Sequence, residues 1–166
     1  MKVILDATVS PNGYISRENF EEDFLPDSGW DAFKESVAKS GNFIIGRHTY
    51  EIIEPELFDS IEATRIIVSS QDLDVRPTFT LAESPEAALK LLENKGFQEA
   101  LVGGGSGLNS SFMRAGLVDE IILYVVPYII GKGTPVFAGE FEAELEFISN
   151  KPFAEGFISR YRVKAK

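Results

Sequence analysis

Cysteine is absent from this chain of 166 residues, and His48 is its single histidine. Without cysteine there is no disulfide, no thiolate nucleophile and no cysteine-ligated metal, and one isolated histidine makes a poor metal site. Long apolar runs are absent too: no stretch of about 18 residues suits a membrane span, and the opening MKVILDATV is too short for the apolar core of a signal peptide. These absences predict a cytoplasmic protein with no bound metal and no membrane association.

Basic residues are in the minority, with 16 Lys and Arg against 26 Asp and Glu, which gives a net charge of −10. A surface of this sign repels nucleic acids and anionic lipids, so we expect neither as a partner. The acidic residues are spread along the chain instead of forming a tail, which is typical of a soluble surface. The length and the 44% hydrophobic content predict a single domain over residues 1–166.

Apolar periodicity divides the chain into alternating strands and helices. The expected strands are residues 2–9, 43–46, 64–70, 79–82, 99–103 and 119–130, followed by a hairpin over residues 144–165. The expected helices are residues 29–40, 47–53, 85–95 and 107–115. Ser28 or Asp27 is placed to cap the first helix, Ser84 to cap the third, and Pro55 follows the end of the second.

This alternation predicts an α/β fold, in which a mostly parallel sheet carries helices on both faces and the terminal hairpin adds antiparallel strands. The sheet is therefore mixed. The apolar strand 119–130 has two interpretations: its surface is covered by a second copy in a homodimer, or it is a central strand buried on both faces.

Three consecutive glycines, Gly103 to Gly105, lie between the strand 99–103 and the helix after it. Neither common glycine-rich fingerprint fits: the Rossmann pattern would need glycine at Leu108 or Ser110, and the P-loop pattern is missing. What remains is a turn with bare backbone N–H groups and a positive helix end at the carboxyl edge of a sheet, which suits a phosphate. The alternative is a tight turn without a ligand.

Two other strand ends carry groups that suit phosphate. The strand 43–46 ends at Gly46 and is followed at once by Arg47, His48 and Thr49, and the next strand ends in Ser69 and Ser70. An arginine fork, hydroxyl groups and free helix N–H groups all donate hydrogen bonds to phosphate oxygens. His48 is either a phosphate contact or simply a polar residue at the start of a helix.

The segments GRHTYE, IIVSSQ and VGGG, in this order and spacing, resemble the dihydrofolate reductase superfamily. The segment GLVDEIILYVVPYIIGKGTPVF is similar to the reductase of riboflavin biosynthesis, the RibD C-terminal branch, and SPNGYI resembles the S-x-D-G-x-I of that branch with Asn12 in place of aspartate. The resemblance implies a dihydrofolate-reductase-like three-layer sandwich with NADPH as cofactor.

The same resemblance implies which residues bind NADPH. Residues 46–49 would contact its phosphates, residues 69–70 would flank the adenosine 2′-phosphate, residues 103–105 would lie along the pyrophosphate and nicotinamide, residues 106–108 would supply helix N–H groups, and the backbone of Ala7 would meet the nicotinamide amide. The full set is Ala7, Gly46, Arg47, His48, Thr49, Ser69, Ser70, Gly103, Gly104, Gly105, Ser106, Gly107 and Leu108.

The chain departs from the folate reductases at the substrate. Those enzymes place an acid early in the first helix, and here Asp27 and Asp31 bracket that position, with Gly29 nearest to it by register. Each aspartate is the candidate proton source or simply a partner of the helix dipole. The arginine that grips the folate tail is replaced by Ala63, with Arg65 two residues further on.

These patterns predict an NADPH-dependent reductase that transfers hydride to a C=N or C=O carbon of a small pterin-like or pyrimidine-like substrate. One alternative is a stand-alone phosphoribosylaminouracil reductase, for which Lys132, Arg160 and Arg162 are the basic residues available to the substrate phosphate. The other is a non-catalytic protein on the same fold that binds nucleotides or dimerises.

Overall fold

The computed structural model describes residues 1–164, except for the side chain of Pro55; residue 165 of the expected hairpin lies outside them. Its centre is an eight-stranded sheet in the order β5-β4-β3-β6-β1-β7-β10-β9, in which the first six strands are parallel and β10 pairs antiparallel with both β7 and β9. The strands are β1 (Lys2–Val9), β3 (Asn42–Gly46), β4 (Thr64–Val68), β5 (Phe79–Ala82), β6 (Glu99–Val102), β7 (Glu120–Val125), β9 (Leu145–Phe153) and β10 (Gly156–Val163). Two short strands, β2 (Tyr14–Ser16) and β8 (Thr134–Pro135), form a separate pair.

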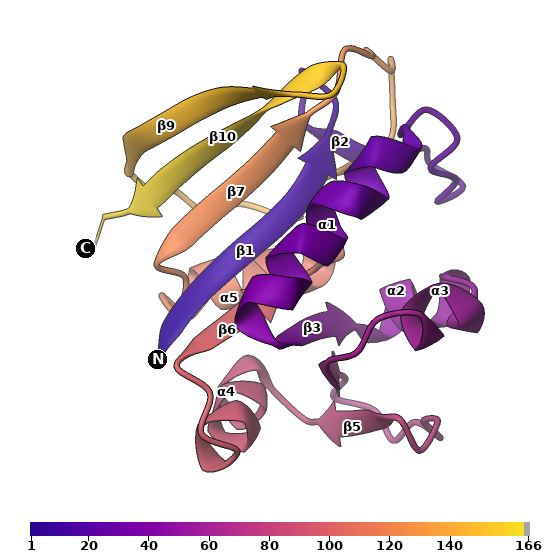
Figure 1. Cartoon of the computed structure of the whole chain (residues 1–166), viewed down its shortest axis with the longest axis vertical. Helices are drawn as coiled ribbons and strands as arrows, with labels where there is room; N and C mark the ends of the chain where they lie inside the picture. The colour runs from indigo at the N-terminus through magenta and orange to yellow at the C-terminus, as the bar shows by residue number, and fades with distance from the viewer. Residues whose placement is uncertain (165–166) are drawn as a thin grey trace.

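Helices cover both faces of this sheet (Figure 1). On one face, α1 packs against β1, β3 and β6 over a core that contains Val37, Phe43 and Phe58. On the other face, α4 and α5 pack over a core that contains Leu5 and Phe112. The helices are α1 (Asp27–Ser40), α2 (Arg47–Ile52), α3 (Pro55–Asp59), α4 (Pro85–Asn94) and α5 (Ser106–Arg114). The predicted three-layer sandwich with a mixed sheet is confirmed.

The two predicted helix caps have different outcomes. Ser84 caps α4 as expected, because its hydroxyl accepts a hydrogen bond from the Ala87 N–H at 3.2 Å. The predicted cap of α1 by Ser28 or Asp27 is wrong, since the helix already begins at Asp27 and has no side-chain cap. The Ser28 hydroxyl instead bonds with the Tyr124 hydroxyl at 2.9 Å, and so ties the start of α1 to β7.

We expect Ser84→Ala to lower the free energy of unfolding by about 1 kcal/mol, because the first turn of α4 loses its capping acceptor. Urea denaturation of both proteins measures the difference. Ser84→Asn is the control, since asparagine caps a helix about as well as serine. Equal losses in the two variants would show that the cap contributes nothing.

The expected strand 119–130 is wrong in its second half. β7 ends at Val125, and Pro127, which lacks a backbone N–H, follows in a loop where Ile129 is 71% exposed. β7 itself pairs with β1 on one edge and β10 on the other, which agrees with a strand covered inside the sheet. Association of two copies stays a prediction.

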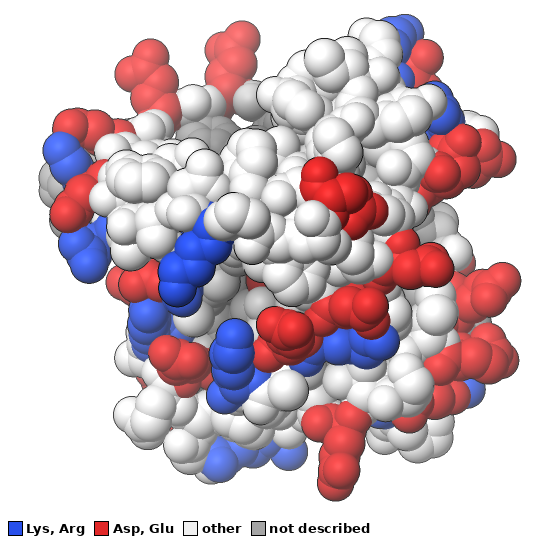
Figure 2. Space-filling view, turned by 45° about the horizontal axis from the view of Figure 1, so that its top comes forward, with Lys and Arg blue, Asp and Glu red and all other residues white. Residues whose placement is uncertain are grey.

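The surface carries its acidic side chains in a scattered pattern. On the face drawn in Figure 2, Asp and Glu stand around most of the rim with Lys and Arg among them, and they do not gather into one patch. Within residues 1–164, no helix has the length and hydropathy that crossing a bilayer requires.

Candidate functional site

A cleft of about 1120 Å³ opens at the carboxyl ends of β1, β3, β4 and β6. It opens there because one edge of β1 is unpaired beyond Leu5. The pairing of β1 with β6 ends at Leu5 and Val102, whereas its pairing with β7 continues to Val9. The chain leaving β6 turns toward β3, where the Gly103 N–H donates to the Ile44 carbonyl at 2.9 Å. Residues 6–8 of β1 therefore have a free edge that faces the cleft.

The predicted NADPH-binding residues and the two candidate acids all line this one cleft. The three strand ends that carry phosphate-compatible groups belong to β3, β4 and β6, which are neighbours in the sheet. The lining includes Ala7, Gly46, Arg47, His48, Thr49, Ser69, Ser70, Gly103, Gly104, Gly105, Ser106, Gly107, Leu108, Asp27 and Asp31.

The glycine segment tolerates side chains poorly, through close contacts at two positions and through the backbone conformation at the third. A Cβ atom on Gly103 would lie 2.8 Å from the Phe33 ring, and one on Gly105 would lie 3.0 Å from the Thr49 hydroxyl. Gly104 has a φ of +93°, a conformation that residues with a side chain rarely adopt. Its carbonyl accepts a hydrogen bond from the Gly46 N–H at 2.7 Å, so the two glycine turns support each other.

Polar atoms beside this segment lack partners. The Ser106 hydroxyl and the Asn109 side-chain oxygen are buried, and no hydrogen bond reaches them from residues 1–164. The first bond inside α5 runs from the Asn109 N–H to the Gly105 carbonyl at 2.9 Å, so the N–H groups of residues 106–108 stay free of helical partners. The Ser106 hydroxyl and the free N–H groups at this positive helix end can donate hydrogen bonds to a phosphate ligand, whereas the Asn109 oxygen can only accept one.

The polar end of the cleft is built by the start of α2 and the end of β4. Arg47 donates to the Glu51 carboxylate at 3.1 Å, and its half-exposed guanidinium keeps further donors for a ligand. His48 packs against the Phe20 ring with centroids 4.3 Å apart. Ser69 is buried and folds the loop by bonding with Gln71, which leaves Ser70 as the exposed hydroxyl of the pair.

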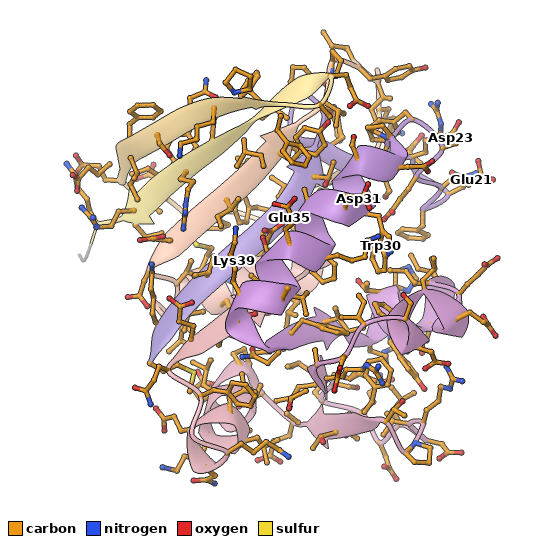
Figure 3. All side chains as sticks on the ribbon, viewed as in Figure 1. Glu21, Asp23, Trp30, Asp31, Glu35 and Lys39 are labelled. Atoms are coloured by element: carbon orange, nitrogen blue, oxygen red, sulfur yellow. The ribbon has the colours of Figure 1, made fainter. Side chains whose placement is uncertain are left out.

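The other half of the cleft has an aromatic wall. Trp30 stacks on Phe33 with ring centroids 5.4 Å apart and meets the edge of Phe58 at 6.1 Å. Figure 3 shows Trp30 on the side of α1 that faces α2 and α3, and Lys39 on the opposite side, over β1. Gly29 lets α1 approach β1 closely, because a Cβ there would lie 3.1 Å from Thr8. The flat rings of a ligand can stack on such a wall.

Four carboxylates line this half of the cleft. Asp27 is exposed, and Asp31 is exposed and paired with Lys34 at 2.7 Å. Desolvation by the surrounding loop raises the pKa of the Glu22 carboxyl, although the residue as a whole is exposed. Asp6, in the middle of β1, is 6% exposed, and burial raises its pKa to about 6.

Asp6 did not emerge from sequence reasoning, although a signal was present. KVILDATV is apolar on both sides of this one carboxylate, and a central strand of a parallel sheet is normally apolar throughout. A charged residue at such a position needs a compensating partner or a function.

The basic residues considered for a substrate phosphate lie elsewhere. Lys132 pairs with Glu18, Arg160 with Glu120 and Arg162 with Glu146, and none of the three basic side chains lines the cleft. Arg65, beyond the position of the folate-tail arginine, also lies outside the cleft, because its guanidinium donates to the Ile61 carbonyl. The half of the cleft that carries the aromatic wall, which we call the substrate half, therefore offers carboxylates and rings in place of a phosphate site.

Comparison with known proteins agrees with this architecture. The family model of the RibD C-terminal domain matches residues 1–159. The uncharacterised protein YyaP of Bacillus subtilis is 26% identical over 176 residues, which covers 95% of this chain and 92% of YyaP. A crystal structure described as a riboflavin biosynthesis protein from Shewanella sp. PV-4 superposes with a TM-score of 0.81 at 21% identity, over 99% of this chain and 100% of that one. Dihydrofolate reductase from Enterococcus faecalis, complexed with NADP(H), gives a TM-score of 0.76 at 16% identity, over 99% and 97% of the two chains.

Proposed function

The chain belongs to the RibD C-terminal domain family, and from this premise we propose that it is a cytoplasmic NADPH-dependent reductase. Its substrate is a small heterocycle of the pterin or pyrimidine kind with a reducible C=N or C=O bond. One observation carries the proposal: a glycine segment that tolerates side chains poorly, flanked by the unpaired Ser106 hydroxyl and a helix N-terminus, continues along the same cleft into an aromatic wall.

The residues present suit an elongated dinucleotide. Its 2′-phosphate end would lie near Arg47 and Ser70, its pyrophosphate near residues 103–108, and its nicotinamide at the free edge of β1 near Ala7. When bound, such a cofactor supplies hydride. The chain contributes binding, orientation of the two rings against each other, and exclusion of water by Trp30 and Phe33.

The carboxylates of the substrate half favour an unphosphorylated substrate. A ribose phosphate would face Glu22, Asp27 and Asp31 there, and the nearest cation, Lys34, is already paired with Asp31. Repulsion between the negative charge of the phosphate and these carboxylates opposes binding. This arrangement favours a pterin-like or pyrimidine-like ring over the phosphoribosylaminouracil that the riboflavin pathway would supply.

Titration of the purified protein with NADPH and NADH tests the proposal, because Trp30 lines the cleft and its fluorescence reports binding. We expect saturable quenching with NADPH and weaker quenching with NADH. Absence of binding by either dinucleotide would refute the reductase. A protein that binds NADPH but oxidises it with none of a panel of pterins, dihydropterins and aminopyrimidines would be the non-catalytic alternative.

We expect Arg47→Ala to raise the Kd for NADPH about tenfold and to leave the Kd for NADH unchanged, because a half-exposed charge-assisted hydrogen bond to the 2′-phosphate is lost. Fluorescence titration of the variant measures both constants. Arg162→Ala is the matched control, since Arg162 is also ion-paired and about half-exposed but lies on β10 outside the cleft. An unchanged NADPH preference in Arg47→Ala would move the 2′-phosphate site elsewhere.

A further inference from the structure

Asp6 occupies a position where a carboxylate is costly. β1 is a central strand with β6 and β7 on its two edges, and Asp6 is 6% exposed on the face that α1 covers. Ile4 and Thr8 precede and follow it on the same face. Burying an ionised carboxylate without a close cation is unfavourable, so this residue either has such a cation or spends part of its time protonated.

No cation pairs directly with Asp6 within residues 1–164. The Ser36 hydroxyl on α1 donates to its Oδ2 atom at 2.5 Å. Arg160 lies in the same row across the sheet, because Asp6 pairs with Ile122 and Ile122 pairs with Arg160, but its guanidinium donates to Glu120 at 3.1 Å.

The charges around Asp6 come from four elements. Arg160 on β10 and Lys39 on α1 favour the charged carboxylate from a distance, but burial outweighs both. Glu120 on β7 pairs with Arg160 at 3.1 Å and with Lys2 on β1 at 2.9 Å, and so holds both of these cations of the sheet. With its pKa raised to about 6, Asp6 keeps a neutral, proton-donating form at mildly acidic pH.

Asp6 is also reached from the cleft. It lies on the free edge of β1 that begins where the pairing with β6 stops, and it lines the cleft together with Ala7 and Thr8. Ala7 is the residue whose backbone would meet the nicotinamide. A substrate ring that stacks against the nicotinamide and the Trp30 wall would thus lie beside the Asp6 carboxyl.

The other carboxylates in this half of the cleft are exposed to solvent. Asp27 and Asp31 are exposed at the start of α1, and Lys34 pairs with Asp31. Glu22 stands on the loop before α1 and is exposed as a residue. Among the cleft carboxylates, Asp6 alone combines burial, a free edge toward the cleft and the absence of an ion pair within the described chain.

We propose that Asp6, and neither Asp27 nor Asp31, is the catalytic acid that protonates the substrate, an inference that rests on the proposed function. As the carbon of the C=N bond receives hydride from the reduced nicotinamide, its nitrogen takes the proton of the Asp6 carboxyl. The products are an amine with new C–H and N–H bonds, the oxidised dinucleotide and the Asp6 carboxylate. The carboxylate then regains a proton from water in the cleft.

Carboxyl titration by ¹³C NMR of aspartate-labelled protein tests this without turnover. The Asp6 signal, assigned by its loss in Asp6→Asn, should titrate near pH 6 in the NADPH-bound protein and should shift when 2,4-diaminopteridine is added as a substrate-like probe. An Asp6 signal that shifts with neither NADPH nor 2,4-diaminopteridine, or shifts confined to the signals of Asp27 or Asp31, would overturn the assignment.

Kinetics give the second readout. With 7,8-dihydropterin as hydride acceptor, kcat/KM should fall above about pH 6 in the parent protein, whereas Asp6→Asn should be roughly 100-fold slower and lack this pH limb. Asp27→Asn and Asp31→Asn should keep the decrease above about pH 6. If parent and Asp6→Asn bind NADPH equally and share one pH profile, the acid is misassigned but the reductase stands. If the parent binds no dinucleotide, the reductase itself fails.

Discussion

Replacing Gly104 with alanine is expected to raise the Kd for NADPH by roughly 100-fold. Gly104 has a φ of +93°, so alanine must either accept a strained backbone or rotate the peptide groups that face the ligand. Loss of two backbone hydrogen bonds to a charged phosphate, at about 1.5 kcal/mol each, corresponds to that change in affinity. Fluorescence titration with NADPH gives the ratio directly.

Gly96→Ala is the matched control for this variant. Gly96 has a similar φ of +85°, a Cβ there would meet nothing within 4 Å, and the residue lies outside the cleft. Both substitutions should lower the free energy of unfolding by about 1–2 kcal/mol through the backbone alone. Only Gly104→Ala should lose affinity. Equal NADPH binding by the two variants would mean that the glycine segment does not hold the dinucleotide.

Replacing Asp6 with asparagine is expected to stabilise the protein by up to about 3 kcal/mol at pH 8, because the folded pKa of about 6 lies above the ordinary value of 3.8. Between these values the folded protein binds more protons than the unfolded chain, so stability falls as the pH rises from about 4 to about 6. Above pH 6 the parent carries the full cost of a buried charge. Asparagine avoids this cost and still accepts the Ser36 hydrogen bond.

Thermal unfolding of parent and variant at pH 4, 6 and 8 measures this effect. The Tm difference should be near zero at pH 4 and roughly 6–12 °C at pH 8, by the usual scaling for a chain of this size. Asp31→Asn is the control, since Asp31 is an exposed cleft carboxylate whose replacement should change Tm little at any pH. A destabilised Asp6→Asn at pH 8 would show that the carboxylate is a structural ion partner of Arg160 and Lys39.

The sequence predicted those features of the fold that depend on local patterns. Apolar periodicity located the main strands, and the glycine and serine segments at strand ends indicated a shared site. The expectation that three such ends are neighbours holds because β3, β4 and β6 are adjacent in the sheet. Parallel strands bring their carboxyl ends to one edge, which is why short motifs far apart in the chain converge.

Features that depend on long-range contacts, and one helix whose local signal is ambiguous, were not predicted. The second half of the strand 119–130 fails because apolar periodicity continues past Pro127, whereas the sheet pairing ends at Val125. The helix α3 was missed because proline ends one helix and yet is well placed at the first position of the next. The cap of α1 was misplaced because Ser28 bonds with Tyr124, a contact that no local pattern reveals.

Asp6 illustrates the same limit within the site. Acids were sought at the start of the first helix, where Asp27 and Asp31 lie, because the resemblance implies one there. The structure instead buries a carboxylate on the strand that α1 covers. The free-energy cost of burying the Asp6 carboxylate depends on Arg160, which pairs with Glu120 on another strand. The sequence cannot show that arrangement.

An ¹⁵N spectrum of glycine-labelled protein before and after addition of NADPH shows directly whether the glycine segment holds the dinucleotide. Of the 14 glycines, those at the proposed dinucleotide site are Gly46, Gly103, Gly104, Gly105 and Gly107. We expect these five amide signals to shift and the signals outside the cleft, such as those of Gly13, Gly96 and Gly139, to stay in place. Shifts confined to glycines outside the cleft, or no shift at saturating NADPH, would contradict this expectation.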